Sequence, residues 1–325
     1  MNYETELIWN SHVGDFQGYI KTKIPEIAVV DCYIATNGFT GNRALLIDFN
    51  IDLSTADFKF QRFRGVEIQI LHLPDKQELA VILMENSLSG VFTLLVEDML
   101  SEMSDCSNES MALAAAFRII GLWKRMFENL SPDGLTAEQQ RGLFGELYFM
   151  RQAVNEGISP ALMLESWQGP DAANQDYIIN NIGVEIKATA ANHASIQISN
   201  EWQLSSAHLD KLFLYLLELT ERKGEALTLN SIISELRNTF GTNPALMDNF
   251  SQKLIRAGYL DEHTALYQRK DYVVRRISAF QVTTGFPKIS GEDVPDGIHS
   301  ITYKIEPAAC DDYRIEPDNL FANLI

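Results

Sequence analysis

Residues 176–187 constrain the fold of this chain more than any other segment. Their sequence is Asp-Tyr-Ile-Ile-Asn-Asn-Ile-Gly-Val-Glu-Ile-Lys, in which Asn180 and Asn181 separate two short apolar runs. Asparagine and glycine are the residues that tight hairpin turns favour, so the segment is predicted to be a β-hairpin. If the turn centres on Asn180 and Asn181, Asp176 lies directly opposite Glu185, with about 5 Å between their Cβ atoms.

The second strand of this hairpin is predicted to present two charged side chains on one face. Glu185 and Lys187 are two residues apart and therefore share a face, whereas Val184 and Ile186 point the other way into the core. With Asp176, two carboxylates and one amine converge on one side of an apolar hairpin. The alternative is a solvated face with a surface salt bridge, which contributes little to stability.

This group of side chains is suited to phosphate chemistry. Mg²⁺ favours oxygen ligands and usually takes one or two carboxylates, with waters or phosphate oxygens completing its shell. A metal ion held by Asp176 and Glu185, with the backbone carbonyl of Ile186 as a further ligand, would polarise a phosphate and activate a bound water. Lys187 would stabilise the negative charge that develops in the transition state or help to position the nucleophile.

The spacing of Asp176, an eight-residue gap and Glu185-Ile186-Lys187 resembles the PD-(D/E)XK nuclease superfamily. The resemblance implies a mixed sheet flanked by helices, with the catalytic residues on a central hairpin. Residues 142–147 look like the first core helix, whose glutamate, Glu146 here, often joins the metal site. Residues 196–199 and 201–204 look like the strand and helix that follow the lysine.

The whole arrangement also resembles a bacterial family of PD-(D/E)XK-motif proteins associated with restriction-modification and phage-defence loci. Its ordered elements are a GELY run at 145–148, a W-x-GP run at 167–170, the ExK and a QL pair at 203–204. This resemblance implies a Mg²⁺-dependent DNA endonuclease, with Mn²⁺ able to substitute, and protein partners from the same defence system. A homodimer is one arrangement that it allows.

One departure concerns the literal Pro170-Asp171 pair. Asp171 follows Gly169 and Pro170 and is predicted to lie in a turn, too far back to face Glu185, so we assign the catalytic aspartate to Asp176. A longer hairpin turn would change the register and weaken this choice.

Three further polar residues have competing interpretations. Glu146 is either an exposed glutamate or a site residue, and we favour the site because Gly142 and Gly145 would let its helix approach the sheet closely. Gln203 fits the third position of a capping box begun by Asn200, or a contact to the substrate phosphate near Lys187. His193 has no second histidine at ligand spacing and is not predicted to bind metal.

The chain divides into three predicted regions. Residues 1–107 are β-rich, with strands expected at 28–30, 44–49 and 66–70. Residues 108–220 are the predicted nuclease-like core. They begin with a helix whose apolar face comprises Met111, Ala115, Ile119, Leu122, Met126 and Leu130.

The rest of the core and the third region follow a break at 131–134. A capping box at Thr136–Gln139 opens the next helix, and residues 212–217 form a strand that is apolar on both faces. Residues 221–325 are expected to hold two helices between 230 and 258 and a β-hairpin over 267–282, a winged-helix-like order. The fold class is therefore α/β, in a multi-domain α+β arrangement.

The net charge of −18 argues against a simple DNA-binding protein, because phosphate neutralisation normally requires a basic face. Basic residues gather only at 59–64, where they alternate with aromatic residues, and at Arg269, Lys270, Arg275 and Arg276. The simpler reading of the first group is an amphipathic strand edge, and that of the second is a solvated hairpin. A DNA-facing surface would have to be local, or a partner would have to supply it.

Other features place the chain in the cytoplasm, away from membranes. No apolar run approaches the ~20 residues that cross a bilayer, and the N-terminus is acidic where a signal peptide would be basic. The three scattered cysteines suit a reducing compartment.

Three functions follow from the sequence, in order of preference. The first is the endonuclease subunit with catalytic residues Asp176, Glu185, Lys187, Glu146 and Gln203. The second is a catalytically inactive nuclease fold that docks on a partner ATPase or methyltransferase. The third is a DNA-sensing regulator that uses the winged-helix-like region.

Overall fold

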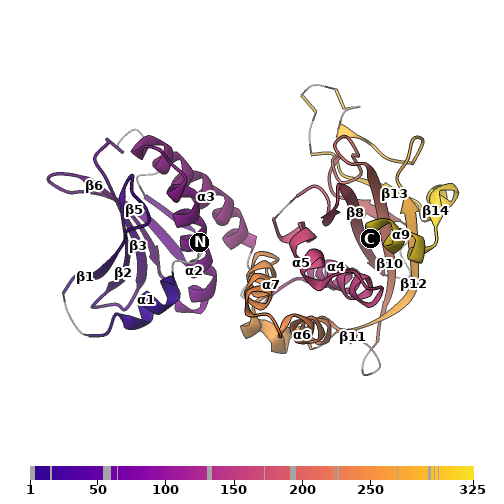
Figure 1. Ribbon diagram of the computed structural model, residues 1–325, viewed down its shortest axis with the longest axis horizontal. Coiled ribbons are helices and arrows are strands. Elements are labelled where there is room, and N and C mark those ends of the chain that lie inside the picture. The colour runs from indigo at the N-terminus through magenta and orange to yellow at the C-terminus, as the bar shows by residue number, and fades with distance from the viewer. Residues whose placement is uncertain are drawn as a thin grey trace. The chain divides into compact units, whose positions relative to one another are not determined.

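The computed structural model divides into two compact units, residues 1–130 and 131–325 (Figure 1). It describes residues 4–14, 17–53, 60–63, 65–129, 134–171, 173–190, 195–222, 224, 227–268, 270–291, 294–295, 297–298 and 300–325. This division differs from the three regions that the sequence suggested, whose boundaries fell after residues 107 and 220. No helix in these described ranges is long and apolar enough to cross a membrane.

The first unit is an antiparallel sheet with helices. Its strand order is β1-β2-β3-β6-β5-β4. The strands are β1 (Tyr19–Ile24), β2 (Asp31–Asn37), β3 (Arg43–Phe49), β4 (Phe60–Phe63), β5 (Val66–His72) and β6 (Gln77–Leu83), and the helices are α1 (Thr5–Ser11), the short η1 (Asn86–Leu88), α2 (Ser89–Ser104) and α3 (Glu109–Asn129). The predicted strands at 44–49 and 66–70 are confirmed, whereas residues 28–30 form no strand.

Helix α3 belongs to the first unit because it packs against α2. The indole Nε1 of Trp123 donates to Asp98 Oδ2 of α2 at 3.0 Å. The predicted apolar face was wrong at two of its positions, since Met111 is 50% exposed and Leu122 is 46% exposed. The buried face is built instead from Ala112, Ala116, Ile119, Ile120 and Trp123.

The second unit contains a mixed sheet in the order β11-β12-β10-β8-β7, with β14 beside β12. Its strands are β7 (Tyr177–Ile179), β8 (Ile182–Ala190), β10 (Lys211–Glu221), β11 (Leu227–Thr228), β12 (Asp271–Gln281) and β14 (Arg314–Ile315). Strand β8 runs parallel to β10, and the other pairs are antiparallel. Strand β10 is the predicted central strand, and residues 212–217 are buried on both of its faces.

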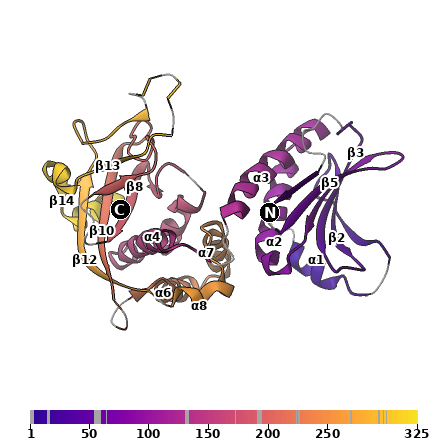
Figure 2. The ribbon, with the colours of Figure 1, turned by 180° about the vertical axis from the view of Figure 1, so that it is seen from behind.

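Different layers cover the two faces of this sheet, as Figure 2 shows from behind. Residues of the helices form one core with the sheet. These helices are α4 (Ala137–Asn155), α5 (Pro160–Ser166), α6 (Leu229–Phe240), α7 (Pro244–Arg256), α8 (Thr264–Tyr267) and α9 (Pro317–Leu324). The predicted capping box of Thr136 and Gln139 begins α4. The opposite face carries a second core under the two-stranded ribbon of β9 (Ile196–Ile198) and β13 (Tyr303–Ile305).

The C-terminal region is not a separate winged helix. The two predicted helices between 230 and 258 exist as α6 and α7, but the predicted hairpin over 267–282 is one long strand, β12, that pairs with β10 along its length. An apolar, alternating segment can pair with a distant strand as readily as with its neighbour in sequence. The reading of a DNA-sensing winged helix therefore loses its structural basis.

Candidate active site

The predicted hairpin is present and has the predicted turn. Ile179 pairs with Ile182, and the two residues between them, Asn180 and Asn181, have φ angles of 49° and 64°. Two successive residues with positive φ are the mark of a two-residue type I′ turn, which asparagine tolerates better than most residues. Tyr177 pairs with Val184, so the same register continued by one residue places Asp176 opposite Glu185.

Asp176 immediately precedes the short strand β7, and hydrogen bonds hold both its side chain and its backbone carbonyl. Its Oδ2 accepts a hydrogen bond from the Ile186 N–H at 2.7 Å. Its backbone carbonyl accepts from the N–H groups of Gln168 and Gly169, at 2.7 and 3.2 Å. Because β7 begins only at Tyr177, the Asp176 carboxylate occupies the edge of β8 where a strand that began earlier would have paired. The Ile186 carbonyl points to this same edge, since both backbone groups of a strand residue face one neighbour.

Glu185 and Lys187 share a face of β8, and Val184 and Ile186 point into the helix-covered core, as predicted. Glu185 is 1% exposed, and one of its oxygens lies 2.8 Å from the Lys187 Nζ. Apart from this ion pair, neither carboxylate oxygen accepts a well-formed hydrogen bond among the described residues, although the Asp176 N–H lies near enough to lower the pKa of Glu185. A buried carboxylate with so few donors is costly unless a further positive charge completes its shell.

Gln203 holds the lysine in place. Its Oε1 accepts from the Lys187 Nζ at 3.0 Å and from the Ser199 N–H at 2.8 Å. Asn200 Oδ1 accepts from the N–H of Gln203, which resembles the predicted cap, but residues 200–204 form turns and not the predicted helix. The side chain of Gln203 thus contacts Lys187. A capping role alone, which was one of the two predictions for Gln203, would not need this contact.

Glu146 reaches the site from helix α4. A Cβ at Gly145 would lie 2.8 Å from the Cβ of Ala188 on β8, so glycine is needed for the helix to approach the sheet at this point. A Cβ at Gly142 would meet nothing within 4 Å, so only one of the two glycines has the predicted role. The phenol of Tyr177 donates to the Glu146 backbone carbonyl at 2.9 Å and ties the helix to β7.

The W-x-GP run has a structural role that the sequence did not reveal. The Trp167 Nε1 donates to the Glu146 Oε2 at 2.7 Å. A Cβ at Gly169 would lie 2.3 Å from that same oxygen, so the glycine leaves room for the carboxylate. Trp167 orients the Glu146 carboxylate, and Gly169 leaves the space that this carboxylate occupies. In the sequence, the W-x-GP motif itself was the only signal of this role.

The site places three carboxyl groups around the ammonium group of Lys187, and the pKa values of all four groups are raised above their ordinary values. Burial raises the pKa of Asp176 to about 6, against the effects of Lys187 and the Ile186 N–H. Burial, reinforced by Asp176, raises the pKa of Glu185 to about 8 against the effect of Lys187. Burial and Asp176 also raise the pKa of Glu146 well above its ordinary value. Burial works to lower the pKa of Lys187, but Glu185 and the other carboxylates outweigh it and raise that pKa.

These residues fit a divalent cation by their chemistry. In the described part of the chain no three His, Cys, Asp or Glu side chains are arranged as a metal-binding group. However, the side chains of Asp176, Glu185 and Glu146 offer only oxygen atoms as ligands, and the raised pKa values of these carboxyls mean that a cation would compete with protons for them. This donor set matches the preference of Mg²⁺ for oxygen.

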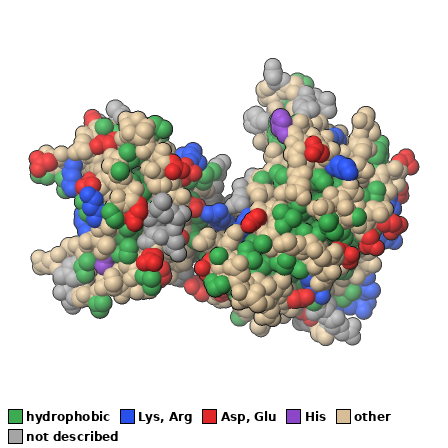
Figure 3. Space-filling view, in the orientation of Figure 1, with side chains coloured by type: hydrophobic (Ala, Val, Ile, Leu, Met, Phe, Trp, Pro, Cys, Tyr) green, Lys and Arg blue, Asp and Glu red, His purple; other side chains and the backbone are tan. Residues whose placement is uncertain are grey.

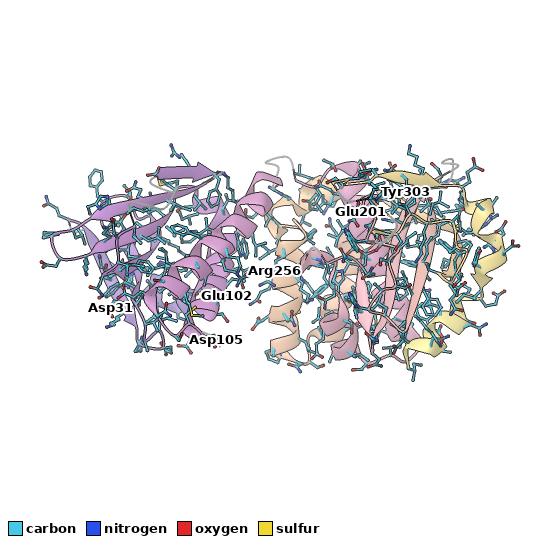
Figure 4. The ribbon with its side chains drawn as sticks, turned by 90° about the horizontal axis from the view of Figure 1, so that it is seen from above. Asp31, Glu102, Asp105, Glu201, Arg256 and Tyr303 are labelled. Atoms are coloured by element: carbon cyan, nitrogen blue, oxygen red, sulfur yellow. The ribbon has the colours of Figure 1, made fainter. Side chains whose placement is uncertain are left out.

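Two further residues border the site. Tyr303 of β13 lies close enough for Lys187 and Glu185 to affect the pKa of its phenol, which burial raises. Figure 4 labels it beside Glu201, whose Oε2 accepts from the Ile301 N–H at 2.9 Å. Tyr303 and Glu201 are both far in sequence from the residues that they interact with, and no sequence motif marked either of them, so neither was predicted as a site residue.

The remaining sequence candidates either lie outside the described residues or form ion pairs elsewhere in the second unit. The backbone of Asp171 lies in the short helix η2 (Gly169–Asp171), and its side chain is outside the described residues, as are His193, Arg269, Lys59 and Arg64. Lys270 lies 3.3 Å from Glu221, and Arg276 lies 3.9 Å from Glu218. The predicted basic cluster is thus partly neutralised by acidic residues of β10.

Comparison with known protein families gives a match that spans most of the chain. The model of a family described as "Putative PD-(D/E)XK family member, (DUF4420)" matches residues 5–307. No curated protein and no solved structure matches the chain.

Proposed function

Because this chain belongs to the DUF4420 family of PD-(D/E)XK proteins, whose model spans nearly all of it, we propose that it is a metal-dependent endonuclease that hydrolyses DNA phosphodiesters. One observation carries the proposal. Asp176, Glu185 and Lys187 meet on a single hairpin, and Glu146 approaches them from α4. A buried group of three carboxyls with raised pKa values is typical of a functional site.

The proposed metal ligands are Asp176, Glu185, the Ile186 carbonyl and Glu146. They would hold Mg²⁺, or Mn²⁺ in its place, which when bound would polarise the scissile phosphate and activate a water molecule. Trp167 keeps the Glu146 carboxylate directed toward the other acids.

Lys187 has the proposed role of stabilising negative charge on the phosphate. Its raised pKa keeps the amine protonated at neutral pH. Its Nζ is held by Gln203 and Glu185, so little reorganisation is needed when charge develops. Gln203 is therefore a positioning residue in this proposal.

The biological setting is proposed from the sequence resemblance alone. We place the protein in the cytoplasm, in a restriction or phage-defence system with protein partners, and as a homodimer if both DNA strands are cut. On the face shown in Figure 3, Lys and Arg are interspersed with Asp and Glu across each unit. With a net charge of −18, a partner that supplies basic surface would assist DNA binding.

The direct test is cleavage of plasmid, linear and single-stranded DNA with Mg²⁺ or Mn²⁺. Wild type should cut, and Asp176→Ala and Lys187→Ala should not, although both should remain folded. The exposed Asp312→Ala variant, from the same unit, is the control and should cut like wild type. Cleavage that survives Lys187→Ala would contradict the assignment.

A second candidate is the inactive nuclease fold that docks on an ATPase or a methyltransferase. It is favoured by the protein donors that already engage Asp176 and Glu146, and by the lack of a preformed three-residue metal group among the described residues. Calorimetric titration with Mn²⁺ separates the two functions. Binding that is lost in Asp176→Ala supports the nuclease, and absence of binding in wild type supports the docking module.

A further inference from the structure

Trp202 presents one open face of its indole beside the candidate active site. The chain has four tryptophans. Trp9, Trp123 and Trp167 are at most 5% exposed, whereas Trp202 is 42% exposed. An exposed indole is costly to keep in water, so its surroundings are informative.

Gly291 covers the other face of this indole. A Cβ at Gly291 would lie 2.6 Å from Cη2, 2.6 Å from Cζ2 and 2.7 Å from Cε2 of Trp202. A point that is almost equidistant from three consecutive ring atoms lies over the face of the ring and not at its edge. The glycine backbone therefore packs flat against one face, and the exposed area belongs to the opposite face and the rim.

Hydrogen bonds hold the turn that carries Trp202 in place. The buried Gln175, the residue before Asp176, donates through its amide to the backbone carbonyls of Trp202, Gln203 and Ser205, at 3.0, 3.3 and 3.4 Å. Asn200 Oδ1 accepts from the Trp202 N–H at 2.9 Å. The indole is thus preorganised, which lowers the entropy that a ligand must remove on binding.

The same turn connects Trp202 to the catalytic lysine. The next residue, Gln203, contacts the Lys187 Nζ at 3.0 Å. The Lys288 Nζ donates to the Leu204 carbonyl at 2.8 Å and holds the segment before Gly291 on this turn. A planar group stacked on Trp202 would therefore bind to the same turn whose Gln203 holds Lys187.

We infer that Trp202 is a stacking platform for a nucleobase and that the substrate is single-stranded, or locally unpaired, at the cleavage site. A base within a duplex has both faces covered by its neighbours and cannot stack on a side chain unless it is unpaired. Stacking on an aromatic residue contributes about 1–3 kcal/mol per base with little sequence preference. This inference rests on the proposed function, because it assumes that the ligand of the site is a nucleic acid.

The test uses the full chain in EDTA and low salt, where no cleavage occurs. The probes are a short oligothymidylate, an abasic strand with the same number of phosphates, and a duplex of equal length. Oligothymidylate should quench tryptophan fluorescence, because Trp202 is the exposed tryptophan, and should bind more tightly than the other two. Equal binding of the abasic strand would overturn the inference, as would failure of wild type to bind any oligonucleotide.

Variants then locate the effect, with binding followed by the anisotropy of a labelled oligothymidylate. Trp202→Ala should weaken binding about 5- to 150-fold, the equivalent of the stacking energy, whereas Trp202→Phe should retain most of it. Gly291→Ala should also weaken binding, because its methyl group would displace the indole without removing it. Phe39→Ala is the control, since Phe39 is 90% exposed in the first unit.

The outcomes separate this inference from the proposed function. Unchanged binding in Trp202→Ala overturns the inference, even if Lys187→Ala abolishes cleavage and the nuclease stands. Trp202-dependent binding of the single strand, with no cleavage by wild type, supports Trp202 as a stacking platform and counts against the nuclease and against a cleaved substrate.

Discussion

Replacing Glu185 with glutamine should change how the stability of the metal-free second unit depends on pH. Burial and the neighbouring Asp176 raise the pKa of Glu185 from 4.5 to about 8. Between these values the folded state keeps a proton that the unfolded state releases, so the free energy of unfolding falls as pH rises. The contribution of Glu185 is fully present below pH 4.5 and is lost progressively toward pH 8.

The magnitude follows from the size of the shift. One pKa unit corresponds to about 1.4 kcal/mol. From pH 5 to pH 7.5, wild type should therefore lose about 3 kcal/mol of unfolding free energy through Glu185. Glu185→Gln exchanges no proton at this position, so over the same interval it should gain about 3 kcal/mol relative to wild type.

The assay is urea unfolding in EDTA at pH 5, 6 and 7.5, with hydrogen exchange in peptides of β10 as the probe of the second unit. Glu262→Gln, an exposed change in the same unit, should stay within about 0.5 kcal/mol of wild type at each pH. Parallel profiles for wild type and Glu185→Gln would mean that Glu185 is ionised in the folded protein, and the reasoning would be refuted.

Three other predictions test the site and its support. Gly145→Ala should destabilise the second unit by about 1–3 kcal/mol in thermal unfolding, because its Cβ would meet Ala188, whereas Gly142→Ala should be neutral or slightly stabilising; equal losses would refute the close approach. Mn²⁺ affinity measured by calorimetry should rise roughly tenfold per unit between pH 6 and pH 8, because binding displaces a proton from a carboxyl; a flat profile would contradict the raised pKa values. Gln203→Ala should lower the cleavage rate about tenfold through the lost hydrogen bond to Lys187, and an unchanged rate would remove its positioning role.

The hairpin could be predicted because its determinants are local. Two asparagines able to adopt positive φ define the turn, and the turn fixes the register that brings Asp176 opposite Glu185. The burial of Val184 and Ile186 follows from the same alternation. The role of Gly145 was accessible for a similar reason, since glycine is the residue type that a close approach requires. Gln203 was predicted to lie near Lys187, but its hydrogen bond to the lysine was not predicted.

Features that depend on distant segments could not be predicted. Trp167 bonds to Glu146 from 21 positions away, and Trp202 packs on Gly291 from 89 positions away. Strand β12 pairs with β10 instead of folding back on itself, and nothing in its alternation distinguishes these choices. The apolar face of α3 was partly misplaced because two of its buried positions, Ala112 and Ala116, are alanines, which carry little hydrophobic signal.

The paired segments on either side of Asn180 and Asn181 also limit how the length of this chain can vary. Side chains alternate between the faces of a strand, so one residue inserted within the paired residues 177–179 or 182–184 would turn one carboxylate toward the helices and leave the other in place. The same insertion in an exposed loop elsewhere would leave their spacing unchanged. Insertions and deletions in these paired segments therefore separate Asp176 from Glu185, because there the distance along the chain determines the distance across the site.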